Sequence, residues 1–152
     1  METLILEDRL FDMISGNSGI VLVLINMYRK TKKPIYLQKA IQIAEQLIEN
    51  MITENGKVGW KSEVVPEVLA GFAHGNSGFI ELFSRLYEVY PQTKYLDILS
   101  SLVEYENSLY SEKDNNWIDL RKFSEVDQHK SQPIAWCHGA AGILLSRLTL
   151  YN

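Results

Sequence analysis

Apolar and polar residues follow two alternating patterns along this chain. Residues 17–30 and 76–90 carry apolar side chains on most helical faces, which predicts two deeply buried helices. Residues 35–52 and 94–110 instead alternate apolar and polar sides at helical spacing, as in the stripe of Ile41, Ala44, Leu47 and Ile48. We therefore expect each buried inner helix to be followed by an amphipathic outer helix with one face in water.

Short breaks separate the two helices of each pair. Residues 32–34 and 91–93 each contain a proline, whose fixed φ and missing N–H favour a helix boundary. After each pair, residues 54–60 and 112–120 are predicted to form turns or short strands containing a tryptophan. Asn and Ser residues at the start of the inner helices predict side-chain N-caps there: Asn17, Ser18, Asn76 and Ser77.

The whole pattern repeats. Gly-x-(Ser/Ala)-Gly occurs at 16–19, 75–78 and 139–142, about 60 residues apart, and an apolar residue follows each second glycine. A tyrosine stands nine positions after each second glycine, as Tyr28, Tyr87 and Tyr151. Matches in the same register indicate an internal repeat, so the predicted fold class is all-α, built from repeated helical hairpins.

Composition narrows the class of protein. The 152 residues are 46% hydrophobic and 22% charged, typical of one globular domain. A net charge of −4 argues against a nucleic-acid partner, which favours a basic face. One cysteine excludes an intrachain disulfide and favours a cytoplasmic location. The longest apolar run, 20–25, is too short for a transmembrane segment.

Candidate chemistry gathers just before the glycine turns. Asp12 lies four residues before the first turn, His74 immediately precedes the second, and Cys137 and His138 precede the third. If the hairpins are arrayed around a common axis, these positions point to one region, and a carboxylate, an imidazole and a thiol converge. Taken singly, Asp12 could be a surface acid, His74 a structural histidine and Cys137 a buried apolar residue. The shared register favours a common functional site instead.

These residues resemble a known family. The stretches FDMISGNSGI, GFAHGNSGF and AWCHGAAGI, in this order and at these intervals, resemble the lanthionine synthetase C-like proteins, from about residue 8 to the end. The resemblance implies an α/α toroid of seven helical hairpins. It also implies zinc-dependent addition of peptide cysteine thiols to dehydroalanine or dehydrobutyrine, which forms lanthionine thioether rings in a dehydrated precursor peptide.

The resemblance also implies roles for single residues. Cys137 would be the first of three ligands of a Zn²⁺ ion, His74 a catalytic acid/base group and Asp12 the acidic residue opposite it. The second cysteine and the histidine ligand come from a later Cys-His-Gly motif that this sequence does not contain. His138 occupies a variable position and is not the ligating histidine.

We therefore expect residues 1–152 to be a partial cyclase domain of about two and a half hairpins. Upstream hairpins and the C-terminal Cys-His-Gly repeat are missing from it. A catalytic zinc needs about three protein ligands and an open position, so the isolated chain is expected to be inactive. Self-association through exposed inner-helix surface is a further expectation, since repeats bury their apolar faces against neighbours.

Three other functions stay open. The first is a metal-free helical-repeat binding scaffold, in which the glycines only shape turns. The second is a different toroid enzyme such as a glycosidase, although paired carboxylates are not evident beyond Asp12. The third is a member of the same family that acts on glutathione.

Overall fold

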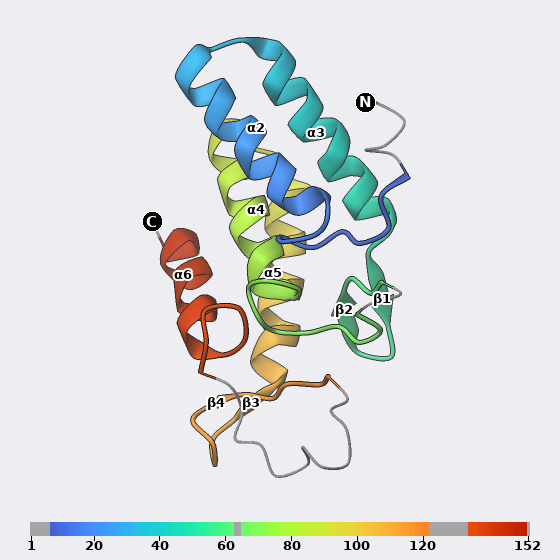
Figure 1. Ribbon diagram of the computed structural model, residues 1–152, viewed down its shortest axis with the longest axis vertical. Coiled ribbons are helices and arrows are strands. Elements are labelled where there is room, and N and C mark those ends of the chain that lie inside the picture. Colours follow the sequence, from blue (N-terminus) through green and yellow to red (C-terminus); the bar gives the residue numbers. More distant parts are fainter. Residues whose placement is uncertain (1–6, 63–64, 122–133, 152) are drawn as a thin grey trace.

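The computed structural model describes residues 7–62, 65–121 and 134–151, and it is mostly helical. Two antiparallel helical hairpins follow each other (Figure 1). The first pairs α2 (Asn17–Thr31) with α3 (Pro34–Glu49), and the second pairs α4 (Asn76–Val89) with α5 (Thr93–Ser108). A further helix, α6 (Ala140–Tyr151), starts at the third glycine motif. The predicted all-α fold class of repeated hairpins is confirmed.

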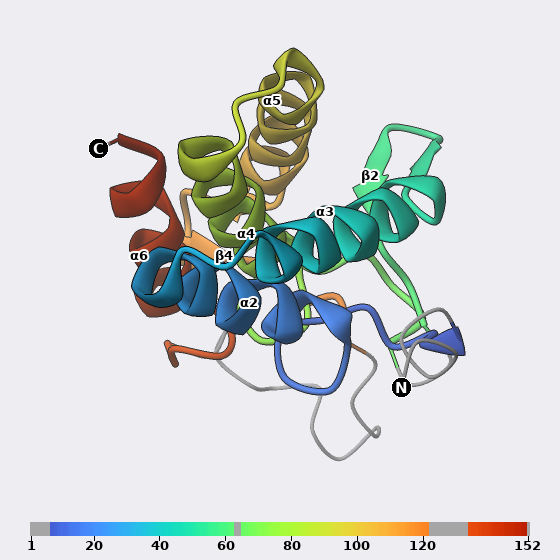
Figure 2. The same cartoon turned by 90° about the horizontal axis from the view of Figure 1, so that it is seen from above.

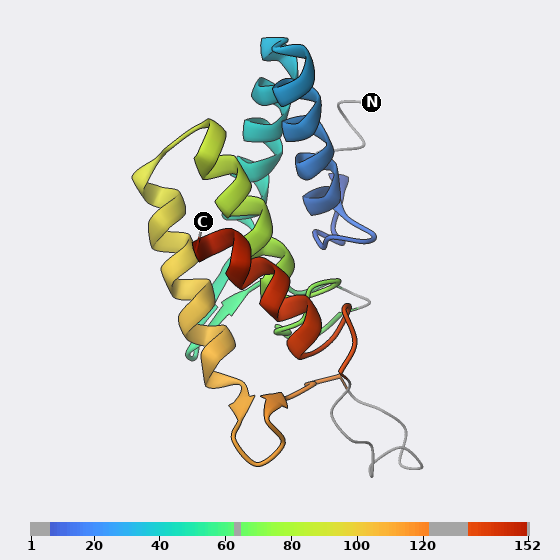
Figure 3. The ribbon, with the colours of Figure 1, turned by 90° about the vertical axis from the view of Figure 1, so that its left-hand side faces the viewer.

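The inner helices are neighbours. Helix α4 packs against both α2 and α6, while α3 and α5 pack on α2 and α4 respectively. Figure 2, from above, and Figure 3, from the side, show α6 next to α4 and α3 farther from it, and Arg147 of α6 also contacts Glu106 of α5. Among the helices in the described ranges, none is long and apolar enough to cross a membrane.

The burial of the two predicted inner helices differs. Nine residues of α4 are buried, as expected. Helix α2 has only four, and Ile20 and Val23 on it are 42% and 61% exposed. The prediction of a deeply buried helix over 17–30 is therefore wrong for much of α2. The reason is position: α4 lies between two inner helices, whereas α2 has one such neighbour in the described structure.

The predicted side-chain N-caps are also wrong. Gly16 and Gly75 are the N-cap residues of α2 and α4, without a side-chain capping bond. The four polar side chains make tertiary hydrogen bonds instead. Asn17 Nδ2 donates to Gln46 Oε1 at 3.1 Å, and Asn76 Nδ2 donates to the Val58 carbonyl at 2.8 Å. Ser18 and Ser77 hydroxyls donate to carbonyls in the loops before their helices.

Two short β-hairpins follow the helical hairpins, as the tryptophan-containing stretches predicted. Strands β1 (Ile52–Glu54) and β2 (Lys57–Gly59) pair antiparallel, with Thr53 opposite Val58. Their turn residues Asn55 and Gly56 have φ of 53° and 75°, the left-handed conformation of tight hairpin turns. Strands β3 (Tyr110–Ser111) and β4 (Asn116–Trp117) form the second hairpin.

Trp60, which follows β2, ties the two helical hairpins together. Its ring stacks on Phe79 of α4 with centroids 3.8 Å apart, and its Nε1–H donates to the Leu47 carbonyl of α3 at 2.7 Å. Both contacts are buried in the main core, whose largest fully buried side chains include Tyr95 and Phe83. The core therefore fixes α3 against α4 and, through them, the ends of the inner helices.

Candidate functional site

Three loops meet where the inner helices begin. They are residues 11–16, 69–75 and 134–139, here called the site loops, and each precedes one of α2, α4 and α6. The Met13 amide donates to the Ala73 carbonyl at 3.1 Å, and the Ala73 amide donates to the Cys137 carbonyl at 3.2 Å. The middle loop is therefore hydrogen-bonded to both others, and the predicted convergence of the glycine turns is confirmed.

The repeated glycines explain how the site loops fold. A Cβ at the second glycine of each motif would lie 1.9–2.4 Å from the carbonyl oxygen of the residue six positions earlier: Met13 for Gly19, Phe72 for Gly78 and Trp136 for Gly142. Each loop thus folds back onto the first turn of its helix, an approach that only glycine allows. Gly71 allows the second and third site loops to approach each other, because a Cβ at this position would lie 2.6 Å from the Cys137 carbonyl oxygen.

Asp12 and His74 form a hydrogen-bonded pair across two site loops. Asp12 Oδ2 lies 2.7 Å from His74 Nδ1, and Asp12 Oδ1 accepts the amides of Ile14 and Ser15 at 3.0 and 2.6 Å. With Asp12 as the acceptor of a hydrogen bond from Nδ1–H, Nε2 of the His74 ring is the atom left to exchange protons. Asp12 is buried, whereas the His74 side chain is 28% exposed.

A second imidazole lies beside this pair. The ring centroids of His74 and His138 are 5.8 Å apart and the planes differ by 27°. Burial lowers the pKa of His138, and the positive charge of Arg121 adds to this, against an opposing effect of Asp119. The lowered pKa favours the neutral imidazole of His138.

Asp119 and Arg121 form an ion pair close to His138. The Arg121 guanidinium donates to both carboxylate oxygens of Asp119, with Nη2 2.5 Å from Oδ2. Burial of Asp119 opposes ionisation, but these bonds outweigh it and lower the pKa of the carboxyl group. Both residues follow β4, and Asp119 and His138 line one small pocket with Gly71 and Trp117.

Cys137 is a half-buried free thiol on the third site loop. A catalytic zinc takes about three protein ligands and keeps one open position. Within residues 7–62, 65–121 and 134–151, no three His, Cys, Asp or Glu side chains are grouped so that they could hold a metal ion. The described residues therefore do not fit a complete zinc site, and Cys137 could supply only one of its ligands.

Glu106 is a buried acid that sequence reasoning missed. Its side chain is fully buried, with Oε1 2.5 Å from the Ser77 hydroxyl oxygen and Oε2 2.5 Å from Arg147 Nη2. Burial raises its pKa to about 7, although both partners favour the charged form. Because Ser77, Glu106 and Arg147 belong to α4, α5 and α6, this cluster holds the third site loop beside the second.

The repeat gives no direct signal for Glu106, because the position 59 residues earlier is Leu47. The hydrogen-bonded pairs Asn17–Gln46 and Ser77–Glu106 have the same separation of 29 residues, but the second pair is shifted by one position relative to the repeat. Each pair joins the first turn of an inner helix to the outer helix. The identity of the third partner, Arg147, depends on how α6 packs.

Comparison with known proteins identifies the family of this chain. The sequence profile of the lanthionine synthetase C-like proteins matches residues 1–152. The lacticin 481/lactococcin biosynthesis protein LcnDR2 of Lactococcus lactis subsp. lactis is 34% identical over 137 residues, which cover 90% of this chain. The matched region spans 12% of the length of that relative. The chain belongs to the lanthionine synthetase C-like family.

Proposed function

We propose that this chain carries the acid–base centre of a lanthionine-forming peptide cyclase, with His74 as the proton-transfer group and Asp12 as its partner. The substrate would be a dehydrated precursor peptide containing a cysteine and a dehydroalanine or dehydrobutyrine. The observation that carries the proposal is the Asp12–His74 hydrogen bond of 2.7 Å between two site loops. Membership of the family and the similarity to a lacticin biosynthesis protein support the substrate class.

The chemistry needs one proton to move from sulfur to carbon. His74 Nε2 takes the proton of the substrate thiol, and the thiolate attacks the β-carbon of the dehydro residue. A C–S bond forms at the β-carbon. The π-electron pair of the C=C bond moves to the α-carbon, which gives an enolate. The His74 imidazolium then returns the proton to the α-carbon, so that thiol and alkene give a thioether without an oxidant or reductant.

Asp12 makes this shuttle effective. Its buried carboxylate faces Nδ1 of His74 and stabilises the imidazolium that exists between the two proton transfers. The backbone amides of Ile14 and Ser15 hold the carboxylate in place. Because His74 is the more exposed partner, a bound peptide can reach the imidazole but not the carboxylate.

Zinc binding at Cys137 is a separate proposal. It needs at least two further ligands from outside the described residues. The proton transfers assigned to His74 do not depend on it.

The test is cyclisation by the complete polypeptide that carries this sequence, comparing wild type with His74→Asn. The substrate is a peptide with one cysteine and one dehydroalanine, and thioether formation is followed by mass spectrometry after alkylation of remaining thiols. Loss of a general acid–base group should slow cyclisation by about 10²–10⁴-fold. Lys94→Gln, an exposed change in the outer helix α5, is the matched control and should cyclise normally.

Two results would contradict the proposal. Normal cyclisation by His74→Asn would remove this histidine from the mechanism. Absence of thioether formation by the wild type would favour the metal-free binding scaffold.

A further inference from the structure

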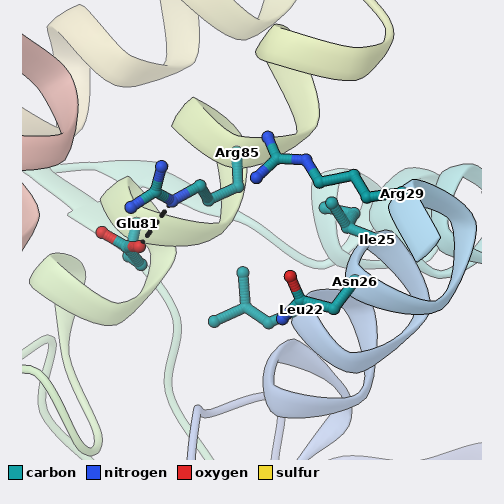
Figure 4. A pocket seen from close by; sticks show the side chains of 6 residues that line it. All are labelled: Leu22, Ile25, Asn26, Arg29, Glu81 and Arg85. Carbon is teal, nitrogen blue, oxygen red and sulfur yellow. Dashed lines mark hydrogen bonds and ion pairs between the residues drawn. The ribbon is translucent and has the colours of Figure 1, made fainter. Parts of the chain in front are cut away.

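A pocket away from the site loops lies between the inner helices α2 and α4. It has a volume of about 320 Å³ and is lined by Leu22, Ile25, Asn26, Arg29, Glu81 and Arg85. Figure 4 shows these side chains, with Arg29 extending from α2 across to α4. Every lining residue belongs to an inner helix and none to α3 or α5. The pocket therefore lies on the helices that begin at the Asp12 and His74 loops.

Two guanidinium groups from different helices share one carboxylate beside this pocket. Arg29 on α2 and Arg85 on α4 both bind Glu88, Arg85 through Nη1 at 3.0 Å. Glu81, only 14% exposed, holds Arg85 through Nε at 2.9 Å, and Thr149 of α6 accepts Arg85 Nη2 at 3.1 Å. Arg85 is thus fixed in position by its neighbours, which is what a preorganised anion-binding group requires.

Glu88 is the replaceable member of this cluster. Its side chain is 41% exposed, and an exposed ion pair contributes little to stability. A carboxylate from a ligand could take its place between the two arginines, because a guanidinium binds carboxylates through paired N–H donors. Leu22 and Ile25 offer an apolar surface to the methylene groups of such a side chain.

The position of the pocket sets a distance from the reaction centre. Helices α2 and α4 start next to each other at the site loops and run in the same direction (Figure 1). At 1.5 Å per residue, Arg29 and Arg85 lie about 18 and 14 Å along them from their first residues, Asn17 and Asn76. An extended peptide rises about 3.3 Å per residue, so this span corresponds to roughly four to five peptide residues.

We propose that the Arg29–Arg85 pocket binds the side-chain carboxylate of an aspartate or glutamate in the substrate peptide, four or five residues from the reacting cysteine. This identification rests on the proposed function, since it takes a peptide as the ligand. Glu88 occupies the subsite in the free protein and leaves it when the peptide carboxylate binds.

The test measures binding without chemistry. Fluorescein-labelled, C-terminally amidated peptides carry serine in place of the reacting cysteine and either glutamate or glutamine five residues before or after it. Fluorescence anisotropy gives Kd for the complete polypeptide. In low salt, the better-placed glutamate peptide should bind about tenfold more tightly than its glutamine partner, and 0.5 M NaCl should reduce this preference.

Variants separate the subsite from a merely structural ion pair. Arg29→Gln should abolish the preference for glutamate, whereas Glu88→Gln should strengthen binding of the glutamate peptide several-fold by removing a competing carboxylate. Lys94→Gln, which removes a cation elsewhere, should leave both affinities unchanged. Circular dichroism should show that all variants keep the helical content of the wild type.

Equal affinities for the two peptides, an unchanged preference in Arg29→Gln, or weaker binding in Glu88→Gln would overturn the proposal. A preference shown only by a peptide with a free C-terminal carboxylate would overturn the side-chain assignment. The outcome is independent of His74. A glutamate preference with no effect of His74→Asn on cyclisation would contradict the proposed mechanism alone, and the reverse result would contradict the subsite alone.

Discussion

Glu106→Gln should remove a pH dependence of stability that the buried carboxyl group creates. Glu106 is fully buried between Ser77 and Arg147, and burial raises its pKa from 4.5 to about 7. A raised pKa means that the folded protein binds a proton at Glu106 more tightly than the unfolded chain does. The stability it contributes is therefore complete below about pH 4.5 and is lost as pH rises towards 7.

The size of this effect follows from the shift. Each pKa unit corresponds to about 1.4 kcal/mol, so the rise to about 7 predicts a loss of roughly 3 kcal/mol in the free energy of unfolding. Glutamine keeps a hydrogen-bonding side chain for Ser77 but cannot ionise. The wild type should therefore lose about 3 kcal/mol relative to Glu106→Gln between pH 4.5 and pH 8.

Urea unfolding followed by tryptophan fluorescence measures this difference at pH 4.5, 6, 7 and 8. Other titrating groups are common to both proteins and cancel in the comparison. Glu104→Gln, an exposed change on the same helix, is the matched control and should parallel the wild type at every pH. A constant difference between wild type and Glu106→Gln, or one that grows in favour of the wild type as pH rises, would refute the reasoning.

Two further substitutions test the packing that positions the site. Gly78→Ala would put a Cβ about 2.4 Å from the Phe72 carbonyl oxygen. The thermal unfolding midpoint should therefore fall by an amount equivalent to about 1–3 kcal/mol. An unchanged midpoint would show that this loop can move away. Trp60→Phe would remove the Nε1–H donor to the Leu47 carbonyl, which keeps the Asn50 amide, and would leave a smaller ring against Phe79. The lost hydrogen bond and the lost packing together should lower the free energy of urea unfolding by about 1–3 kcal/mol. A loss below 0.5 kcal/mol would mean that another donor replaces the indole.

Helix positions were predictable because their cause is local. The alternation of apolar and polar residues places α3 and α5 within a few residues of their observed bounds, since side chains three and four apart share a helix face. The ends at Glu49 and Ser108 come slightly earlier than expected, because the chain turns into β-hairpins there. Register matches between repeats also indicated that Asp12, His74 and the Cys137 loop converge.

The wrong predictions concern side chains whose partners lie far away in sequence. Asn17 and Asn76 have the composition of N-caps, yet their amides bond to Gln46 and Val58 in other elements. Similarly, α2 resembles α4 in its apolar content, but among the described helices only α4 has an inner helix on both sides. Local propensity says nothing about which neighbours a helix will have.

The order of amino acids was enough to indicate an all-α chain of repeated hairpins, the sites of its glycine turns and the residues that gather before them. Three features depended on how the hairpins pack. These are the Asp12–His74 hydrogen bond, the buried Glu106–Arg147 pair and the shared carboxylate of Arg29 and Arg85. Periodicity along one helix is set by contacts within four residues. Hydrogen bonds and ion pairs between helices depend instead on angstrom-scale distances that only the packed core defines.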